Sequence, residues 1–87
     1  MRDVYAKVLK TMFRNHLISK RKELKLTQEK MAQKLVMDNR SYIYLEHGEN
    51  GCSALTLALY LIYFCDDVQV FLDELKSAFE NANEDVD

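Results

Sequence analysis

The residues best able to act as nucleophiles, bases or metal ligands are two cysteines and two histidines. Cys52 and Cys65 lie at the two ends of one apolar segment, which as a helix separates them by roughly 20 Å at about 1.5 Å per residue. That separation excludes a disulfide bond between them. His16 and His47 are dispersed in the sequence, so the four residues have no standard zinc-site spacing. No histidine, cysteine or serine has a partner at catalytic spacing, and we predict no enzyme activity, no metal site and no cofactor.

A second set of residues that can contact a partner lies in the short segment before Gly48. If this segment is a helix, Tyr42, Leu45 and Glu46 share one side of it. The residues that face away from that side are Asn39, Arg40, Ile43 and Tyr44. We expect Tyr42 and Leu45 to belong to the core, which leaves the other set at the surface.

Capping residues and apolar periodicity divide the chain into five predicted helices. Thr27 and Asp38 are N-cap residues for the second and third helices, and Gly48 ends the third. The predicted helices cover residues 3–24, 28–35, 39–47, 53–65 and 68–80. We therefore expect one helical domain over residues 1–80, in which residues 1–11 form an N-terminal helical extension. Residues 81–87 are acidic and polar, and we expect them to fray.

The composition agrees with an all-α domain. Of the 87 residues, 48% are hydrophobic and 30% charged, and the chain has two glycines and no proline, which favours a helical bundle over strands and their turns. The longest apolar run, residues 54–65, is shorter than the roughly 20 residues that span a bilayer. The sequence has no basic stretch followed by an apolar core, which is the pattern that indicates a signal peptide. We expect a soluble cytoplasmic protein that does not enter a membrane.

The net charge of -2 conceals an asymmetry along the chain. Residues 1–50 carry eleven Lys and Arg against six acidic residues, a net charge of +5. Residues 51–87 carry only Lys76 against eight acidic residues, a net charge of -7. A basic half beside an acidic half favours contact of one face with an anionic partner.

Residues 26–48 read LTQEKMAQKLVMDNRSYIYLEHG, preceded by ISKRKELK and followed by an apolar helix. This stretch resembles the helix-turn-helix of the phage-repressor and Cro-type family, also called the xenobiotic-response-element family. The resemblance covers residues 12–65, and its most specific parts are 27–29, Ala32 and 45–48. It implies a five-helix, lambda-repressor-like DNA-binding domain with its helix-turn-helix at about 27–48. The implied function is sequence-specific binding of double-stranded DNA as a transcriptional regulator, a repressor rather than an activator.

The resemblance also implies roles for individual residues. Arg40 is placed where its guanidinium can bond O6 and N7 of a guanine together, and the other implied base contacts are Asn39, Ile43 and Tyr44. Gln28, at the first position of its helix, is placed against a phosphate, where the helix dipole helps. The further phosphate contacts are Lys30, Arg14, Lys34, His47 and Asn50, which position the domain without reading sequence. Arg21 and Glu46 occupy the positions of a buried ion pair in the family.

Two positions depart from the family pattern. Val36 stands at the turn position where glycine is usual, and Lys25 replaces a glycine that often ends the first helix. The backbone at the first of these positions often has a positive φ, which a β-branched residue resists. Either the turn is built differently here, or it is strained by about 1–3 kcal/mol.

The apolar helix predicted at residues 53–65 has more apolar sides than one small bundle can cover, which favours a homodimer. Residues 1–11, or the fifth helix with Phe71, Leu75 and Phe79, are further candidate interfaces. The alternative is a five-helix monomer that buries all of these residues. A second function also stays open: a protein-interaction module, such as an anti-repressor or a toxin–antitoxin partner, that keeps the fold and binds DNA weakly or not at all.

Overall fold

Side-chain caps begin four of the helices in the computed structural model of the protein, and in the last of them Asp67 accepts a hydrogen bond from the Val70 N–H at 3.2 Å. Thr27, Asp38 and Ser53 each accept a hydrogen bond, at 3.1 Å, from the backbone N–H three residues further along the chain. Each bond satisfies one of the donors that a helix start leaves free. The caps at Thr27 and Asp38 confirm the two helix starts that the sequence predicts.

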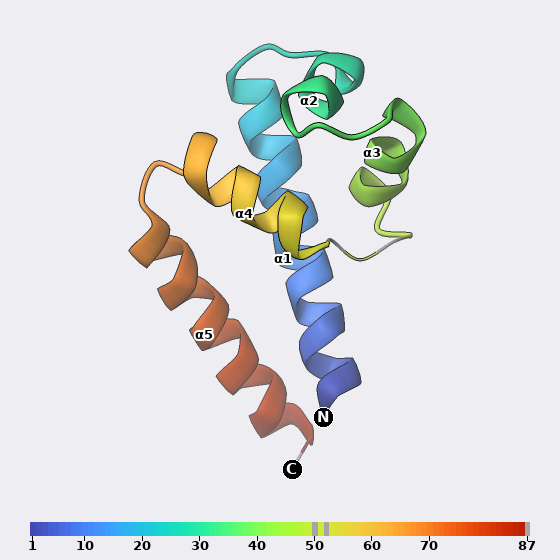
Figure 1. Cartoon of the computed structure of the whole chain (residues 1–87). Helices are drawn as coiled ribbons and strands as arrows, with labels where there is room; N and C mark the ends of the chain where they lie inside the picture. Colours follow the sequence, from blue (N-terminus) through green and yellow to red (C-terminus); the bar gives the residue numbers. More distant parts are fainter. Residues whose placement is uncertain (50, 52, 87) are drawn as a thin grey trace.

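The structure describes residues 1–49, 51 and 53–86, and these residues form five α-helices and no strand (Figure 1). The fold is therefore all-α, as predicted from the sequence. The helices are α1 (Arg2–Glu23), α2 (Gln28–Lys34), α3 (Asn39–Glu46), α4 (Ala54–Tyr63) and α5 (Val68–Val86). The first four begin and end within two residues of the predicted boundaries. Cys52, for which a disulfide with Cys65 was excluded, lies outside the described residues, and Cys65 is a free thiol.

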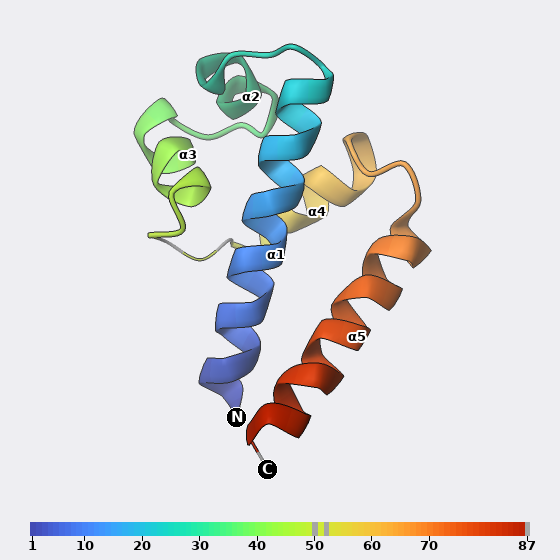
Figure 2. The ribbon, with the colours of Figure 1, turned by 180° about the vertical axis from the view of Figure 1, so that it is seen from behind.

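Helix α5 continues to Val86, beyond its predicted end at residue 80, and the fraying expected of residues 81–87 stays a prediction. Long helices α1 and α5 lie side by side in both views, with the two ends of the chain close together (Figures 1 and 2). The Asn83 side chain donates a hydrogen bond to the Tyr5 hydroxyl at 2.6 Å, and the Tyr5 and Phe79 rings lie 4.7 Å apart. Residues 1–11 therefore supply the surface on which the end of α5 packs.

A single core joins all five helices. Helix α3 contributes Tyr42 and Leu45, the two core residues predicted from the sequence, and α1 contributes one face of its middle turns. The buried apolar residues are Met12, Phe13, Leu17, Met31, Ala32, Leu35, Tyr42, Leu45, Tyr60 and Phe71. Their burial fixes α3 against α1 and α2, which determines the side of α3 that stays at the surface.

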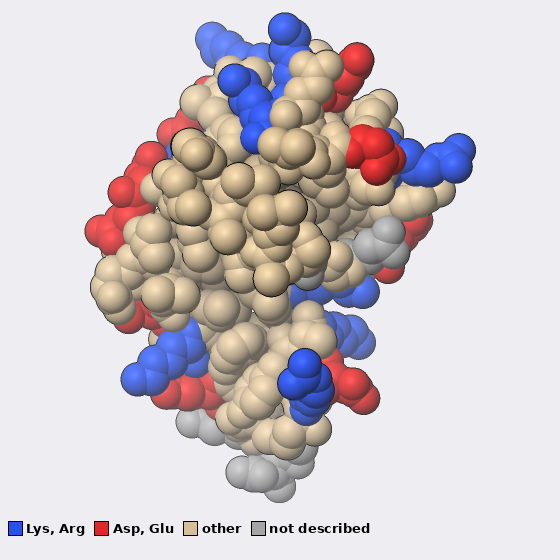
Figure 3. All heavy atoms as spheres, viewed as in Figure 1, with Lys and Arg blue, Asp and Glu red and all other residues tan. Residues whose placement is uncertain are grey.

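Helix α4 buries one side and exposes the other. Thr56 and Tyr60 are buried, whereas Leu55, Ile62 and Tyr63 are exposed. The surface over α4 lacks charged side chains, which gather around its edges (Figure 3). In the part of the chain that the structure describes, no helix has both the length and the apolar character required to cross a membrane.

Candidate nucleic-acid interface

The outer side of α3 presents the four residues predicted to contact bases. Asn39, Arg40 and Tyr44 are exposed and Ile43 is partly buried, while Tyr42 and Leu45 on the other side are buried. Among the described residues, Arg40 has no ion-pair partner and its side chain forms no hydrogen bond. Its guanidinium is therefore free to donate to an external acceptor, and Asn39 and Tyr44 lie on the same exposed side of the helix.

A buried network centred on Glu46 anchors the other side of α3. The Arg21 guanidinium donates to Glu46 through Nε at 2.6 Å and through Nη2 at 3.1 Å, a bidentate ion pair. The Gln28 amide donates to Glu46 Oε1 at 3.1 Å, and Arg21 Nη1 donates to the Leu26 carbonyl at 3.2 Å. The ion pair predicted from the resemblance is present. It connects α1, the start of α2 and the end of α3 through a carboxylate that is 4% exposed.

The charges of this network stabilise one another. Burial opposes ionisation of Glu46, but the hydrogen bonds from Arg21 and Gln28 outweigh it and hold the pKa of Glu46 below its ordinary value. The hydrogen bond to Glu46 raises the pKa of Arg21 despite partial burial. Both groups are therefore charged at neutral pH, and α3 is held at both its inner face and its C-terminal turn.

Two of the residues predicted to contact phosphates, Gln28 and Arg14, have intramolecular partners in the structure. The Gln28 amide nitrogen, expected to face a phosphate, is engaged by Glu46. The Arg14 Nε donates to the backbone carbonyl of Glu46, and Arg14 Nη1 donates to Asn15 at 3.2 Å. Arg14 therefore places a positive charge at the C-terminus of α3, where the helix dipole favours it. Tertiary packing thus brings both side chains to Glu46, and their contact with a phosphate stays a prediction.

The remaining predicted phosphate contacts are distributed over the surface. Lys30 and Lys34 are exposed on α2, and Lys34 lies at the border of an apolar groove. His47 is the exposed C-cap residue of α3. Asn50 lies outside the described residues. Among these residues, Lys30 is the exposed cation nearest the start of α2, and the structure gives it no other role.

The turns that orient the helices adopt positive φ at non-glycine residues. Val36 has φ 55° and Lys25 has φ 57°, so of the two alternatives for the turn the strained one is correct. The Val36 side chain is 77% exposed, so it has no packing within this chain that offsets the strain. Gly48 has φ 74°, and a Cβ atom there would lie 3.4 Å from Arg14 Cδ. Glycine at 48 thus suits both the backbone and the position of Arg14.

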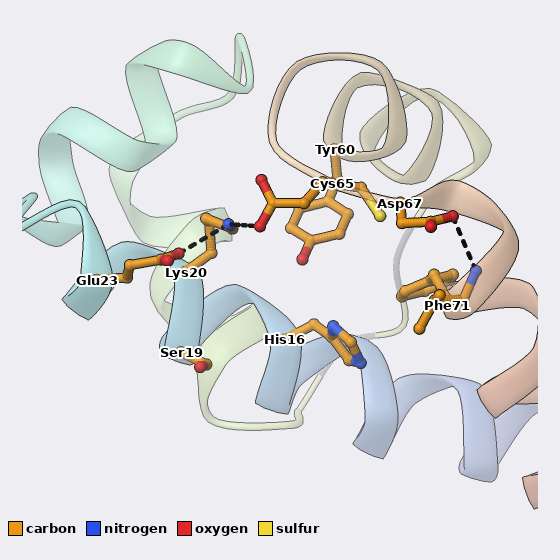
Figure 4. A pocket seen from close by; sticks show the side chains of 10 residues that line it. His16, Ser19, Lys20, Glu23, Tyr60, Cys65, Asp67 and Phe71 are labelled. Carbon is orange, nitrogen blue, oxygen red and sulfur yellow. Dashed lines mark hydrogen bonds and ion pairs between the residues drawn. The ribbon is translucent and has the colours of Figure 1, made fainter.

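A pocket of about 340 Å³ lies between α1, α4 and the start of α5 (Figure 4). Three of its charged groups pair with one another: Lys20 Nζ lies 2.7 Å from Glu23 and 3.0 Å from Asp66. Burial raises the pKa of Tyr60, on its wall, to about 12.

The one hydroxyl–carboxylate hydrogen bond that the described residues form, from Ser41 to Asp38 at 2.7 Å, belongs to the cap of α3. That bond lowers the pKa of Asp38, which makes it a poor base.

Sequence reasoning missed the anchoring role of Arg14. Its contact with α3 spans 32 residues, and neither apolar periodicity nor capping patterns report contacts of that range. Comparisons of the chain with protein-family models, with curated proteins and with solved structures found no match. The resemblance to the phage-repressor family therefore stays a prediction made from the residues of this chain.

Proposed function

We propose that this protein binds double-stranded DNA in a sequence-specific manner through the outer side of α3. The observation that carries the proposal is the free Arg40 guanidinium beside Asn39 and Tyr44 on a helix whose opposite side is anchored by Glu46. A short helix of this kind fits a major groove about 12 Å wide, and its N-terminal residues meet base edges. An anchored helix limits the conformational entropy that is lost when these side chains bind.

In this proposal each side chain has a distinct role. Arg40 donates two hydrogen bonds to one guanine, and Asn39 pairs with an adenine or a phosphate. Ile43 and Tyr44 contact thymine methyl groups, and Lys30 contacts a phosphate. As the resemblance implies, the protein acts as a transcriptional regulator, a repressor, in the cytoplasm.

The proposal is tested by selecting duplexes from a random DNA pool and measuring their affinity by fluorescence anisotropy over a salt series. We expect the logarithm of the association constant to fall linearly with the logarithm of salt concentration. Arg40→Ala should weaken binding to the selected sequence by about 5- to 150-fold, the loss of about 1–3 kcal/mol for one bidentate base contact. Lys76→Ala, which removes an exposed cation from α5, is the matched control and should bind as the unaltered protein does.

Two outcomes would contradict the proposal: no retained duplex at micromolar protein, or equal affinities for Arg40→Ala and Lys76→Ala. Either outcome would favour the second candidate, a protein-interaction module with this fold. One observation supports that candidate, namely that Ile43 and Tyr44 make the outer side of α3 more apolar than cationic. For that module, α3 contacts a protein and Tyr44 is the residue whose replacement matters.

A further inference from the structure

Helix α4 carries an apolar surface that nothing within the described chain covers. The exposed or partly exposed residues Leu55, Ala58, Leu59, Ile62 and Tyr63 recur at three- and four-residue steps and form one side of the helix, here called the α4 stripe. Leu55 is 63%, Ile62 68% and Tyr63 71% exposed. Helix α4 contains no charged residue, and Figure 3 shows a broad uncharged surface over it.

An apolar groove of about 720 Å³ continues the α4 stripe toward the helix-turn-helix. Leu59 and Tyr63 of the stripe line it together with Leu24, Leu26, Lys34, Val36 and Phe64. Lys34 is the only charged residue among them. Val36 is a β-branched residue at φ 55°, a strained backbone conformation for such a residue. Because it is 77% exposed, its side chain adds no stabilising packing within this chain. A partner that covers Val36 would give that side chain the burial it lacks.

The extent of this surface matches one half of a stable interface. The exposed fractions of Leu24, Val36, Leu55, Ile62 and Tyr63 correspond to roughly 600 Å² of side-chain surface, the upper end for a patch on a monomeric protein. A standard protein–protein interface buries about 800 Å² on each partner, including a polar rim. The patch with its rim therefore suffices for a specific complex.

We propose that the α4 stripe and the adjoining groove form a two-fold interface with a second copy of this chain. Leu55 and Ile62 lie at equal distances along α4 from its middle, at Ala58 and Leu59. Two antiparallel copies of α4 that cross there place Leu55 against Ile62 of the partner subunit, and the reverse contact follows by symmetry. The small Ala58 side chain lets the two helices approach closely. Because the stripe is uncharged, a second copy brings no like charges together.

The dimer deepens the proposed function, because two copies of α3 would read two half-sites on one duplex. Its physical basis, the apolar surface of α4, does not involve the residues that contact DNA in the proposal. The test below contains no DNA, so its failure and the failure of DNA binding are separate results.

Sedimentation velocity over protein concentrations from nanomolar to high micromolar tests the interface. The unaltered protein should change from monomer to dimer as its concentration rises. Ile62→Glu should raise the dimer dissociation constant by about 30-fold or more, as expected for a residue at the centre of an interface. Leu72→Glu, the same change at an exposed leucine of α5, should leave that constant unchanged. Circular dichroism verifies that both variants are folded.

A cross-linking experiment tests the same geometry without disturbing the stripe. In a chain whose native cysteines are replaced by serine, Ala58→Cys places two thiols near the two-fold axis, and oxidation should give a disulfide-linked dimer. Leu72→Cys should give little. A monomer at every concentration, a dimer unaffected by Ile62→Glu, or equal cross-linking at both positions would overturn the proposal. A monomer would leave the α4 stripe to a different protein partner.

Discussion

Removal of Arg21 is expected to be the most damaging single change near α3. Arg21→Met keeps most of the side-chain length but deletes both hydrogen bonds to Glu46, whose carboxylate is 4% exposed. An unpaired buried charge costs about 3–5 kcal/mol. A domain of this size has a total unfolding free energy of about 5–15 kcal/mol, so the loss is a large part of it. At about 4–8 °C for each kcal/mol, the Tm should fall by about 12 °C or more.

The loss of stability in Arg21→Met should depend on pH, and the charges of Arg21 and Glu46 determine the direction of that dependence. The pKa of Glu46 in the folded protein lies below its ordinary value of 4.5, so its contribution to stability is present above that value. This contribution disappears as pH falls through the folded pKa. Without Arg21, burial is expected to raise the pKa of Glu46, and protonation then favours the folded variant. The difference between the two proteins should therefore be largest above about pH 5 and shrink below about pH 4.

Urea unfolding of both proteins at several pH values measures this difference. Lys22→Met is the matched control, because it removes an exposed cation from the next position of α1, and it should change stability by less than about 0.5 kcal/mol. The double variant Arg21→Met/Glu46→Leu removes both charges and should regain most of the lost stability. A loss under about 1 kcal/mol, or one of equal size at acidic and neutral pH, would refute a role for charge pairing at this site.

Three further changes test the turns and the packing of the long helices. Val36→Gly should raise the unfolding free energy by about 1 kcal/mol, since relief of strain exceeds the entropic cost of glycine. Thermal unfolding in the monomeric Ile62→Glu background measures this gain, and a lower Tm for the glycine variant would contradict it. Thr27→Ala removes the cap of α2 and should cost about 1 kcal/mol in urea unfolding, whereas no change would show that the cap is dispensable. Asn83→Ala removes the hydrogen bond to Tyr5 and should speed amide hydrogen exchange at the end of α5 but not in α3; uniform exchange rates would count against local fraying.

The inner and outer sides of α3 followed from the sequence because they depend on local rules. Periodicity placed Tyr42 and Leu45 inside and Arg40 outside, and both placements agree with the structure. The cap at Asp38 was equally predictable, since its side chain bonds a backbone group only three residues away. A positive φ at Val36 was one of the two alternatives predicted for the turn. It occurs because the residues around the turn determine its backbone more strongly than Val36 itself does.

The sequence by itself determined the helices, their caps and the apolar faces, which are properties of neighbouring residues. Only the tertiary structure decided how the polar side chains are used. Gln28 and Arg14 reach Glu46 across 18 and 32 residues, and Asn83 reaches Tyr5 across 78. Such partners depend on how whole helices pack, and no local pattern encodes that packing. The same holds for the exposed side of α4, because a continuous apolar helix becomes a surface only when the other helices cover one of its sides.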